Sequence, residues 1–492
     1  MEAKTKKSGA TSQFRYDMFI GGKFTPSSSG KYFQVHNPAT EDVIAEVAEG
    51  TPEDVDRAVA AAEKGFESWQ HLTAYKRSRL IGDLARALES RFEEFAALEC
   101  RNQGKPIRHV RGFDIPNAIE TLDYYAGMAT KSEGLTVDTS PAMHNFVRRE
   151  PYGVVGQIIP WNYPIMMASW KIAPALAAGN AIVIKPAPYT PLTLLKLMEL
   201  ASEVGIPDGV INVVTGMGPV VGRALTRHPG IKKIAFTGST ATGRDVVVNA
   251  SETHKPVILE LGGKSANIFF DDVDLSGALK RGVLGIFHNA GQMCIAGSRI
   301  LLHDKIYDEF LERMTAFVKT MRIGDPTDEK TQLGPLVSDL QRQRVLGFIE
   351  RAGKAGAKLV TGGQPPAHIN RGYYVEPTIF TDVSPNAEIA QEEVFGPVVS
   401  IFRFKDEDEA LAMANGTKYG LAAGVHTNDL ARAHRFAARL QSGTVWVNTY
   451  AYLTPAAPYG GYKQSGHGRE LGGSGLENYT QLKAVFISPN EG

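Results

Sequence analysis

The sequence predicts an α/β protein with two doubly wound parallel sheets and a small extra sheet. Short apolar strands alternate with helical segments between Tyr152 and Gly263, and the alternation starts again after Gly263. Strands and helices that alternate through short connections are typical of parallel sheets covered by helices on both faces. Two further strand-like runs, Asn145–Arg149 and Lys483–Ile487, lie outside both blocks and are candidates for an extra sheet or an oligomer arm.

The N-terminal region is predicted to hold a tail, a hairpin and two helices. Residues 1–15 carry lysines and small polar side chains without the apolar centre of a signal peptide, which predicts a disordered tail. The pair Gly21-Gly22 favours a hairpin turn. Thr51 can cap a helix that has Pro52 at its first position, and a second helix is expected over Lys76–Cys100.

The block between Tyr152 and Gly263 is predicted to form the first parallel sheet. Its strands are expected at Val154–Ile159, Ala181–Ile184, Val210–Val214, Lys233–Phe236 and Val257–Leu261. One helix is expected over Ile165–Ala178, and another should be capped by Thr190 and begin at Pro191. Ligands bind at the carboxyl ends of the strands in such sheets.

The chain after Gly263 is predicted to form a second α/β domain. Strand-like and helix-like runs continue to alternate there, at Asn267–Phe270, Ser276–Asn289, Arg299–His303, Tyr307–Met321, Leu411–Asn415, Gly424–Thr427 and Ala431–Ala438.

The composition is that of an ordinary globular protein. Of 492 residues, 43% are hydrophobic, and 53 basic residues balance 53 acidic ones, so the basic field of a nucleic-acid binder is lacking. Two cysteines, Cys100 and Cys294, do not make a disulfide scaffold and suit a reducing compartment. No apolar run approaches the roughly 20 residues of a membrane span. We therefore expect a cytoplasmic enzyme for a small molecule, without a metal, membrane or nucleic-acid partner.

Three residues have the chemistry of a covalent catalyst. Cys294 is a candidate nucleophile, Glu260 a base at a strand end, and Asn162 a donor to an oxyanion. Each has a structural alternative, namely a buried core thiol, a surface glutamate, and an amide in a turn fixed by Pro160 and Pro164.

Two glycine clusters follow predicted strands and are candidates for phosphate binding. The run Gly216–Gly222 resembles a dinucleotide fingerprint, but its last spacing is one residue too long. In the second cluster, Gly238 and Ser239 would lie at a helix N-terminus, where free N–H groups favour an anion.

Six runs, taken together and in this order, resemble the aldehyde dehydrogenase superfamily in its hydrolytic, non-acylating, NAD(P)-dependent type. The runs are Pro160–Pro164, Phe236–Ser239, Leu259–Lys264, Gly291–Cys294, Glu392–Pro397 and Pro458–Gly466. The resemblance extends from about Tyr16 to Ile487. It implies two Rossmann-like domains plus a small bridging β-sheet for oligomerisation, in a homodimer or homotetramer. The implied boundaries are 16–135 with 152–262 for the dinucleotide-binding domain, 263–465 for the catalytic domain, and 136–151 with 476–492 for oligomerisation.

The resemblance also implies a mechanism. Cys294 attacks the aldehyde carbon, Asn162 and the backbone N–H of Cys294 hold the oxyanion, and a hydride passes to the nicotinamide. Glu260 then activates water to hydrolyse the thioester, and its presence argues for hydrolysis over transfer to coenzyme A. Lys171 and Glu470 resemble a buried pair near the water-relay path, with a purely structural ion pair as the alternative.

Family positions for the cofactor fall on a further set of residues. They are Ile159, Trp161, Lys185, Pro188, Gly218, Gly222, Gly238, Ser239, Leu261, Gln341, Arg344, Glu393 and Phe395. Pro188 replaces a glutamate that, in many NAD-preferring relatives, binds the ribose hydroxyls and repels a 2′-phosphate, and Lys185 could pair with that phosphate. NAD is the expected cofactor, and NADP is expected to be tolerated.

Family positions also predict the aldehyde tunnel. Its lining is expected to be Tyr163, Met167, Trp170, Met293, Ile295, Leu453 and Tyr459. Most are large and apolar, which favours medium-sized hydrophobic aldehydes, aromatic or aliphatic. The alternatives are that some are plain core, and that the aromatic rings bind an aminoaldehyde with a quaternary ammonium. Two other functions stay open at this point: a cofactor-independent thiol esterase, and a non-catalytic binding protein on the same fold.

Overall fold

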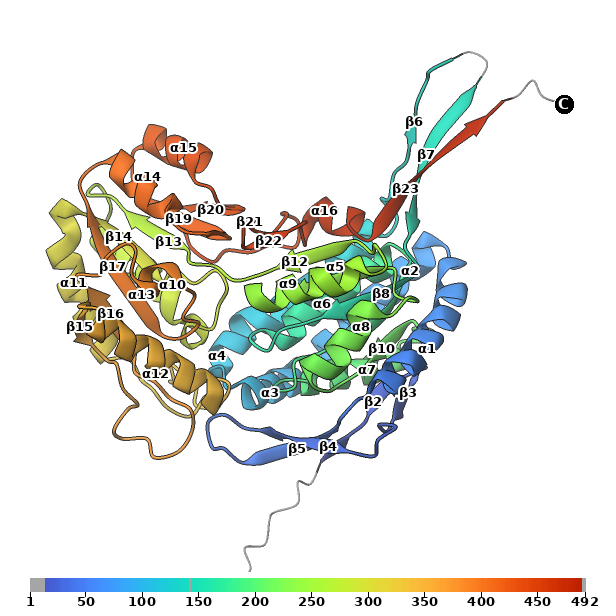
Figure 1. Cartoon of the computed structure of the whole chain (residues 1–492), viewed down its shortest axis with the longest axis horizontal. Helices are drawn as coiled ribbons and strands as arrows, with labels where there is room; N and C mark the ends of the chain where they lie inside the picture. Colours follow the sequence, from blue (N-terminus) through green and yellow to red (C-terminus); the bar gives the residue numbers. More distant parts are fainter. Residues whose placement is uncertain (1–13, 141–142, 489–492) are drawn as a thin grey trace, which may run out of the picture.

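The computed structural model describes residues 14–140 and 143–488 and contains the two large, mainly parallel sheets that the sequence predicts (Figure 1). The first is an eight-stranded sheet in the order β22-β12-β11-β8-β9-β10-β2-β3. Its strands are β2 Met18–Ile20, β3 Lys23–Thr25, β8 Val154–Ile158, β9 Ala181–Lys185, β10 Ile211–Val213, β11 Lys233–Thr237, β12 Val257–Glu260 and β22 Gly466–His467. The strands from β12 to β10 pair in parallel, and the predicted hairpin β2-β3 adds an antiparallel edge.

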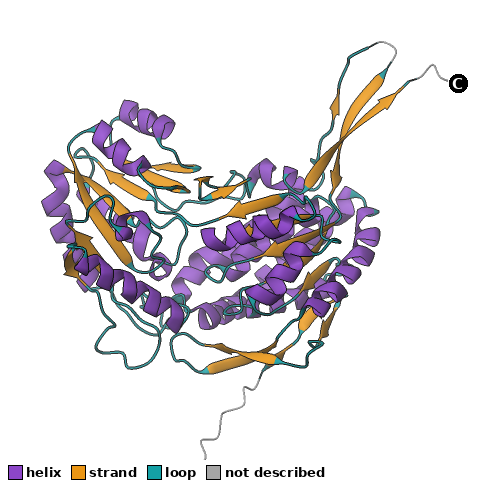
Figure 2. Ribbon diagram, in the orientation of Figure 1, coloured by secondary structure: helices purple, strands orange, loops and turns teal. Residues whose placement is uncertain are grey.

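Helices cover both faces of this sheet, so it is doubly wound (Figure 2). Ile182 and Ile184 of β9 pack in one hydrophobic cluster, whereas Val183 between them packs in another. The first cluster includes α2 Ala74–Ser90, α3 Phe92–Gln103, α5 Ile115–Met128, α6 Pro164–Ala177 and α7 Leu192–Glu203. The second includes most buried residues of α1 Pro52–Gln70, with α8 Arg223–Arg227 and α9 Thr240–Ser251. Alternate side chains of a strand point to opposite faces, so each face has its own core.

The second sheet has seven strands in the order β15-β16-β17-β14-β13-β19-β20. Its strands are β13 Ala266–Phe269, β14 Arg299–His303, β15 Lys358–Thr361, β16 Thr378–Thr381, β17 Val398–Phe404, β19 Ala422–His426 and β20 Thr444–Val447. Only the edge pair β15-β16 is antiparallel in this sheet of the described chain. The accompanying helices are α10 Leu275–Phe287, α11 Asp304–Lys319, α12 Asp339–Lys354, α14 Glu407–Asn415 and α15 Leu430–Arg439.

A third sheet projects from the body as an arm (Figure 1). Strand β7 (His144–Pro151) pairs antiparallel with β23 (Thr480–Ile487) and with β6 (Leu135–Thr136). The two runs outside the main blocks therefore form a sheet together, as predicted. Leu482 and Phe486 of the arm are exposed, and the role of this sheet in assembly stays a prediction.

The segment after the second sheet returns to the first. Strand β21 (Tyr462–Lys463) pairs with β18 (Tyr419–Gly420), and then β22 pairs antiparallel with β12, where Gly466 lies opposite Glu260. One short segment therefore joins the two large α/β units beside the predicted base.

Smaller elements complete the described chain. They are β1 Arg15–Tyr16, β4 Tyr32–His36 and β5 Val43–Ala48 in one sheet, α4 Ile107–His109, the π-helical turns Val110–Asp114 and Gly218–Gly222, the 3-10 turn His288–Gly291, α13 Glu388–Gln391 and α16 Gly472–Glu477.

Three local predictions were wrong. The helix expected over Lys76–Cys100 is broken at Arg91, whose φ of −111° and ψ of 26° end α2 before α3 begins. Thr190 does not cap α7, because its hydroxyl donates to the carbonyl of Trp161, and the Leu192 N–H is bound instead by Asn102 of α3. Arg15, which we assigned to the tail, lies in β1, and residues 1–13 lie outside the described residues.

The helix at Thr51 begins as predicted. Thr51 and Asp54 form a reciprocal capping box, and Pro52 occupies the first turn. Across residues 14–140 and 143–488, no helix combines the length and the apolar character needed to cross a membrane.

Candidate active site

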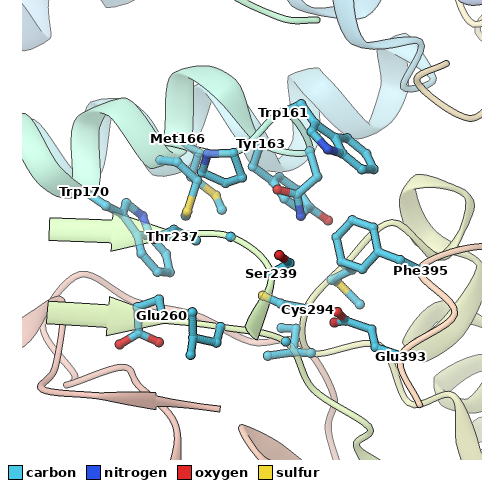
Figure 3. A pocket seen from close by; sticks show the side chains of 18 of the residues that line it. Trp161, Tyr163, Met166, Trp170, Thr237, Ser239, Glu260, Cys294, Glu393 and Phe395 are labelled. Atoms are coloured by element: carbon cyan, nitrogen blue, oxygen red, sulfur yellow. The ribbon is translucent and has the colours of Figure 1, made fainter. Parts of the chain in front are cut away.

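A cavity lies at the carboxyl ends of β8, β11 and β12, beside the loop that carries Cys294. In Figure 3, Glu260 and Glu393 lie on opposite sides of Cys294, and Trp161, Tyr163 and Trp170 line the wall that faces it. The predicted nucleophile, base and oxyanion donor all border this cavity.

The loop before Cys294 has an unusual backbone. Asn289 and Ala290 have φ values of 50° and 53°, and Gly291 has a φ of 71°. A side chain on Gly291 would collide with the carbonyl of Gly396, which explains the glycine. Left-handed conformations in non-glycine residues are costly and persist only where the surroundings impose them. Here the side chain of Gln292 locks the loop, since its oxygen accepts from the Val337 N–H at 2.9 Å.

Asn162 is fixed to this same loop. Its Nδ2 donates to the Gln292 carbonyl at 3.0 Å, and its own carbonyl accepts from Asn289 at 3.0 Å. Asn162 is buried. One of its two amide hydrogens is engaged, which leaves the second for a ligand.

The Cys294 thiol is half-buried and borders the cavity. Burial raises its pKa to about 12, against the effect of a hydrogen bond with Tyr459. The two atoms, Cys294 Sγ and Tyr459 Oη, are 3.1 Å apart. This contact was not predicted, because we had assigned Tyr459 to the apolar wall.

Glu260 is a buried carboxyl with an unusual environment. Within the described residues, neither of its oxygens has a hydrogen-bond partner. Burial raises its pKa well above the ordinary value, and the nearby Glu470 raises it further. Gly460 packs so closely that a Cβ there would lie 2.7 Å from the Glu260 carboxylate. A buried carboxyl without hydrogen-bond partners and with a raised pKa is a candidate for proton transfer.

Lys171 and Glu470 form a buried ion pair, as the sequence suggested. The Lys171 ammonium also donates to Thr237 Oγ1 at 2.7 Å. Glu470 and Thr237 border the cavity. Thr237 was missed, although its place at the end of a predicted strand pointed toward the ligand edge.

Glu393 and Phe395 lie on a loop that α12 holds in place. Gln341 donates to the Phe395 carbonyl at 2.8 Å, and Arg344 donates to the Glu393 carbonyl at 3.1 Å. One carboxylate oxygen of Glu393 accepts from the Gly263 N–H at 3.0 Å. Burial raises the pKa of Glu393 to about 7. Gln341 and Arg344 therefore bind the backbone of this loop, and both border the cavity.

The other predicted cofactor residues fall into two groups. Trp161, Gly238, Ser239 and Leu261 line the same cavity. Ser239 caps α9, where its hydroxyl accepts from the Thr242 N–H at 3.2 Å.

Five more are outside the cavity lining, at the carboxyl ends of β8 and β9 or in the segments that follow β9 and β10. They are Ile159, Lys185, Pro188, Gly218 and Gly222. Lys185 is buried and donates to the Pro186 carbonyl at 2.8 Å, and burial lowers its pKa to about 8. A Cβ on Gly222 would touch Lys185 at an ordinary 3.9 Å. Gly222 therefore lies beside the lysine, at the end of the π-helical turn Gly218–Gly222 that precedes α8.

The seven predicted tunnel residues all border the cavity. They are Tyr163, Met167, Trp170, Met293, Ile295, Leu453 and Tyr459. Phe113 and Met166 join them without having been predicted. Trp170 is also a core residue, because it is almost fully buried in the hydrophobic core. Its indole N–H donates to Asn117 at 2.7 Å, and its ring meets Tyr459 edge-on.

Comparison with known proteins identifies the family. A model of the aldehyde dehydrogenase family matches residues 24–485. An aldehyde dehydrogenase of Emericella nidulans is 49% identical over 470 residues, which cover 95% of this chain and 94% of the relative.

Solved structures agree. The NAD+ complex of an aldehyde dehydrogenase from Bacillus cereus has a TM-score of 0.95 and 46% identity, covering 97% of each chain. A point mutant of betaine aldehyde dehydrogenase from Staphylococcus aureus, in complex with NAD+, has a TM-score of 0.95 and 39% identity, covering 97% of each chain. The chain therefore belongs to the aldehyde dehydrogenase family, and its activity is the oxidation of aldehydes.

Proposed function

We propose that this chain oxidises medium-sized hydrophobic aldehydes with NAD, through a thioester on Cys294 that water hydrolyses. The observation that carries the proposal is the placement of Cys294, Asn162 and Glu260 around one cavity. A thiol esterase would need the same three groups. It would have no use for Glu393 or the loop that carries it, so these residues favour the dehydrogenase.

The residues of this chain supply most of the chemistry. The Cys294 sulfur attacks the aldehyde carbon, and the free amide hydrogen of Asn162 stabilises the oxygen that becomes negative. When bound, NAD would accept the hydride that converts the thiohemiacetal to the thioester. Glu260 removes a proton from the water that attacks the thioester carbonyl, and the thiolate of Cys294 leaves.

The residues fit a dinucleotide. Gly238 and Ser239 precede α9, whose N-terminus favours a phosphate. Glu393 has one carboxylate oxygen bound by Gly263, which leaves the other for ribose hydroxyls. Trp161 and Phe395 meet edge-on with ring centroids 5.2 Å apart and form an apolar wall. Solved relatives in complex with NAD+ support NAD as the first cofactor, and Pro188 supports tolerance of NADP.

The lining supports an uncharged substrate. Met166, Met167 and Leu453 add to the aromatic wall. One face of the Tyr163 ring already binds the buried Lys105 ammonium, 3.5 Å from the ring centroid. A fixed cation at this ring disfavours a second cation, which argues for hydrophobic aldehydes over quaternary ammonium ones.

The test measures NAD reduction by the wild type and by a variant that lacks the Cys294 thiol. Reduction of NAD, followed at 340 nm across a panel of aldehydes, should give the highest kcat/KM with aromatic or aliphatic aldehydes. Cys294→Ala should abolish turnover and retain NAD binding by calorimetry. Turnover by Cys294→Ala, or a preference for phosphorylated or dicarboxylic semialdehydes, would contradict the proposal. Light scattering would distinguish the homodimer from the homotetramer.

A further inference from the structure

The hydroxyl of Tyr459 is the side-chain hydrogen-bond partner of the Cys294 thiol, at 3.1 Å. A neutral thiol can donate or accept in this contact. A thiolate can only accept, so the tyrosine O–H donates once the sulfur is ionised. Hydrogen bonds to an ionised group are about twice as strong as those between neutral groups. The contact therefore favours the ionised form of the nucleophile.

We propose that Tyr459 is a catalytic residue of this chain, whose hydroxyl donates a hydrogen bond to the Cys294 thiolate and increases the ionised fraction of the nucleophile. This inference rests on the proposed role of Cys294. Phenylalanine would supply the same apolar wall, so the hydroxyl is what adds the new function.

The Tyr459 side chain is held for this role. Its backbone N–H and carbonyl each form a 2.7 Å hydrogen bond with the backbone of Glu470, whose carboxylate pairs with Lys171. The Trp170 ring meets the Tyr459 ring edge-on, with centroids 5.0 Å apart. A donor that is already in place needs no reorganisation when the sulfur ionises.

Several groups around the thiol favour or disfavour its ionised form. The titratable groups that act on Cys294 or feel its charge are Glu260, Glu393, Tyr163, Tyr450 and Tyr459. Burial and the two carboxylates disfavour the thiolate, whereas the Tyr459 hydroxyl and the Ile295 backbone N–H favour it.

The other two tyrosines do not compete for the sulfur. The Tyr450 hydroxyl donates to the Ile295 carbonyl at 2.8 Å. The Tyr163 hydroxyl is buried without a hydrogen-bond partner in the described residues. Tyr459 is thus the tyrosine whose hydroxyl reaches the sulfur.

The proposal has a defined chemical consequence. As the bond from Sγ to the aldehyde carbon forms, the carbonyl electron pair moves to oxygen and the negative charge leaves the sulfur. Tyr459 keeps its proton throughout, so it acts on the ionisation of the free thiol. Removing the hydroxyl should raise the thiol pKa by about one unit and reduce the thiolate about tenfold near neutral pH. The more basic thiolate is about threefold more nucleophilic, so the net loss is about threefold.

The experiment measures the rate at which iodoacetamide alkylates Cys294 in the cofactor-free enzyme near neutral pH. Tyr459→Phe should react about threefold more slowly than the wild type. Tyr374→Phe is the matched control, because it removes another buried hydroxyl, which donates to the Gly324 carbonyl at 3.1 Å. It should react at the wild-type rate. An unchanged rate in Tyr459→Phe, or an equal loss in the control, overturns the proposal.

A second variant tests the opposite direction. Replacing Tyr459 with 3-fluorotyrosine keeps the ring, stays protonated near neutral pH and makes a stronger donor, so alkylation should become faster. A slower reaction counts against the inference, and this readout holds even where Tyr459→Phe folds poorly. The Cys294→Ala variant distinguishes a failure of the proposed function from a failure of the Tyr459 role. If it still turns over aldehyde, the proposed function fails, whereas an inactive Cys294→Ala with a normal Tyr459→Phe refutes the Tyr459 role alone.

Discussion

Gly262 sets the position of the Glu393 carboxylate, and Gly262→Ala should therefore weaken NAD binding. A Cβ at residue 262 would lie 2.5 Å from Oε2 and 2.9 Å from Cδ of Glu393. The carboxylate must retreat by about 1 Å to reach ordinary contact. That movement stretches its 3.0 Å bond from the Gly263 N–H and displaces the free oxygen that we assign to ribose. Losing one hydrogen bond to a charged group costs about 1.5–3 kcal/mol.

This cost corresponds to roughly a ten- to a hundredfold increase in the Kd for NAD. The clashing atoms are the far end of a flexible side chain, so the fold should yield there with little loss of thermal stability. Titration calorimetry measures the Kd, and thermal unfolding measures stability. Gly353→Ala is the control, because nothing lies within 4 Å of a Cβ at that helical position.

A double-mutant cycle makes the reasoning refutable. Once Glu393→Ala has removed the carboxylate, Gly262→Ala has nothing left to displace, so the pair should bind NAD no more weakly than Glu393→Ala alone. Additive losses in Gly262→Ala and Glu393→Ala, or an unchanged Kd in Gly262→Ala, would show that the glycine does not act through Glu393.

Three further changes test the rest of the site. Glu260→Gln should form one equivalent of NADH in a burst at 340 nm and then stop as the thioester accumulates. Because burial raises the pKa of Glu260, the rate of thioester hydrolysis by the wild type should increase with pH above the ordinary glutamate range. An E260Q enzyme that turns over normally would refute the role of Glu260 as the base. Lys171→Met leaves the buried Glu470 unpaired and should lower the free energy of unfolding by about 3–5 kcal/mol. Denaturant unfolding measures this, and Lys171→Met with Glu470→Leu should recover part of the loss. Pro188→Glu should raise the ratio of kcat/KM for NAD over NADP by at least about tenfold, because the new carboxylate repels the 2′-phosphate. Initial-rate measurements with both cofactors test this, and an unchanged ratio would show that residue 188 does not determine cofactor choice.

Much of the fold was predictable because apolar runs bounded by turns mark buried strands. The strands β8, β9 and β11 began where the sequence placed them. The break at Arg91 was not predictable, because helical periodicity continues through it and the ending depends on how α2 and α3 pack. Likewise, Thr190 does not cap the helix that follows it, because the Leu192 N–H is bound by Asn102 from a distant segment.

The site likewise contains residues that the sequence predicts and contacts that depend on how the chain packs. Cys294, Glu260 and Asn162 were predictable from short runs whose order matches the family. The hydrogen bond between Tyr459 and Cys294 joins residues 165 positions apart. Sequence identified the ring as part of the wall, but the direction of its hydroxyl depends on the bridge to Glu470 and on contact with Trp170. Thr237 could have been predicted as a site residue, since it directly follows the predicted strand that ends at Phe236.

The pairing of β22 with β12 has a consequence for synthesis of the chain. Until residues 466–467 leave the ribosome, β12 is the edge of the growing sheet, with backbone groups open to other strands. Exposed edges are where newly made chains aggregate. The loop through Gly460 that covers Glu260 is made in the same late stage. A chain stopped before this return would lack the wall that completes the site, although its cysteine, base and amide had all been translated.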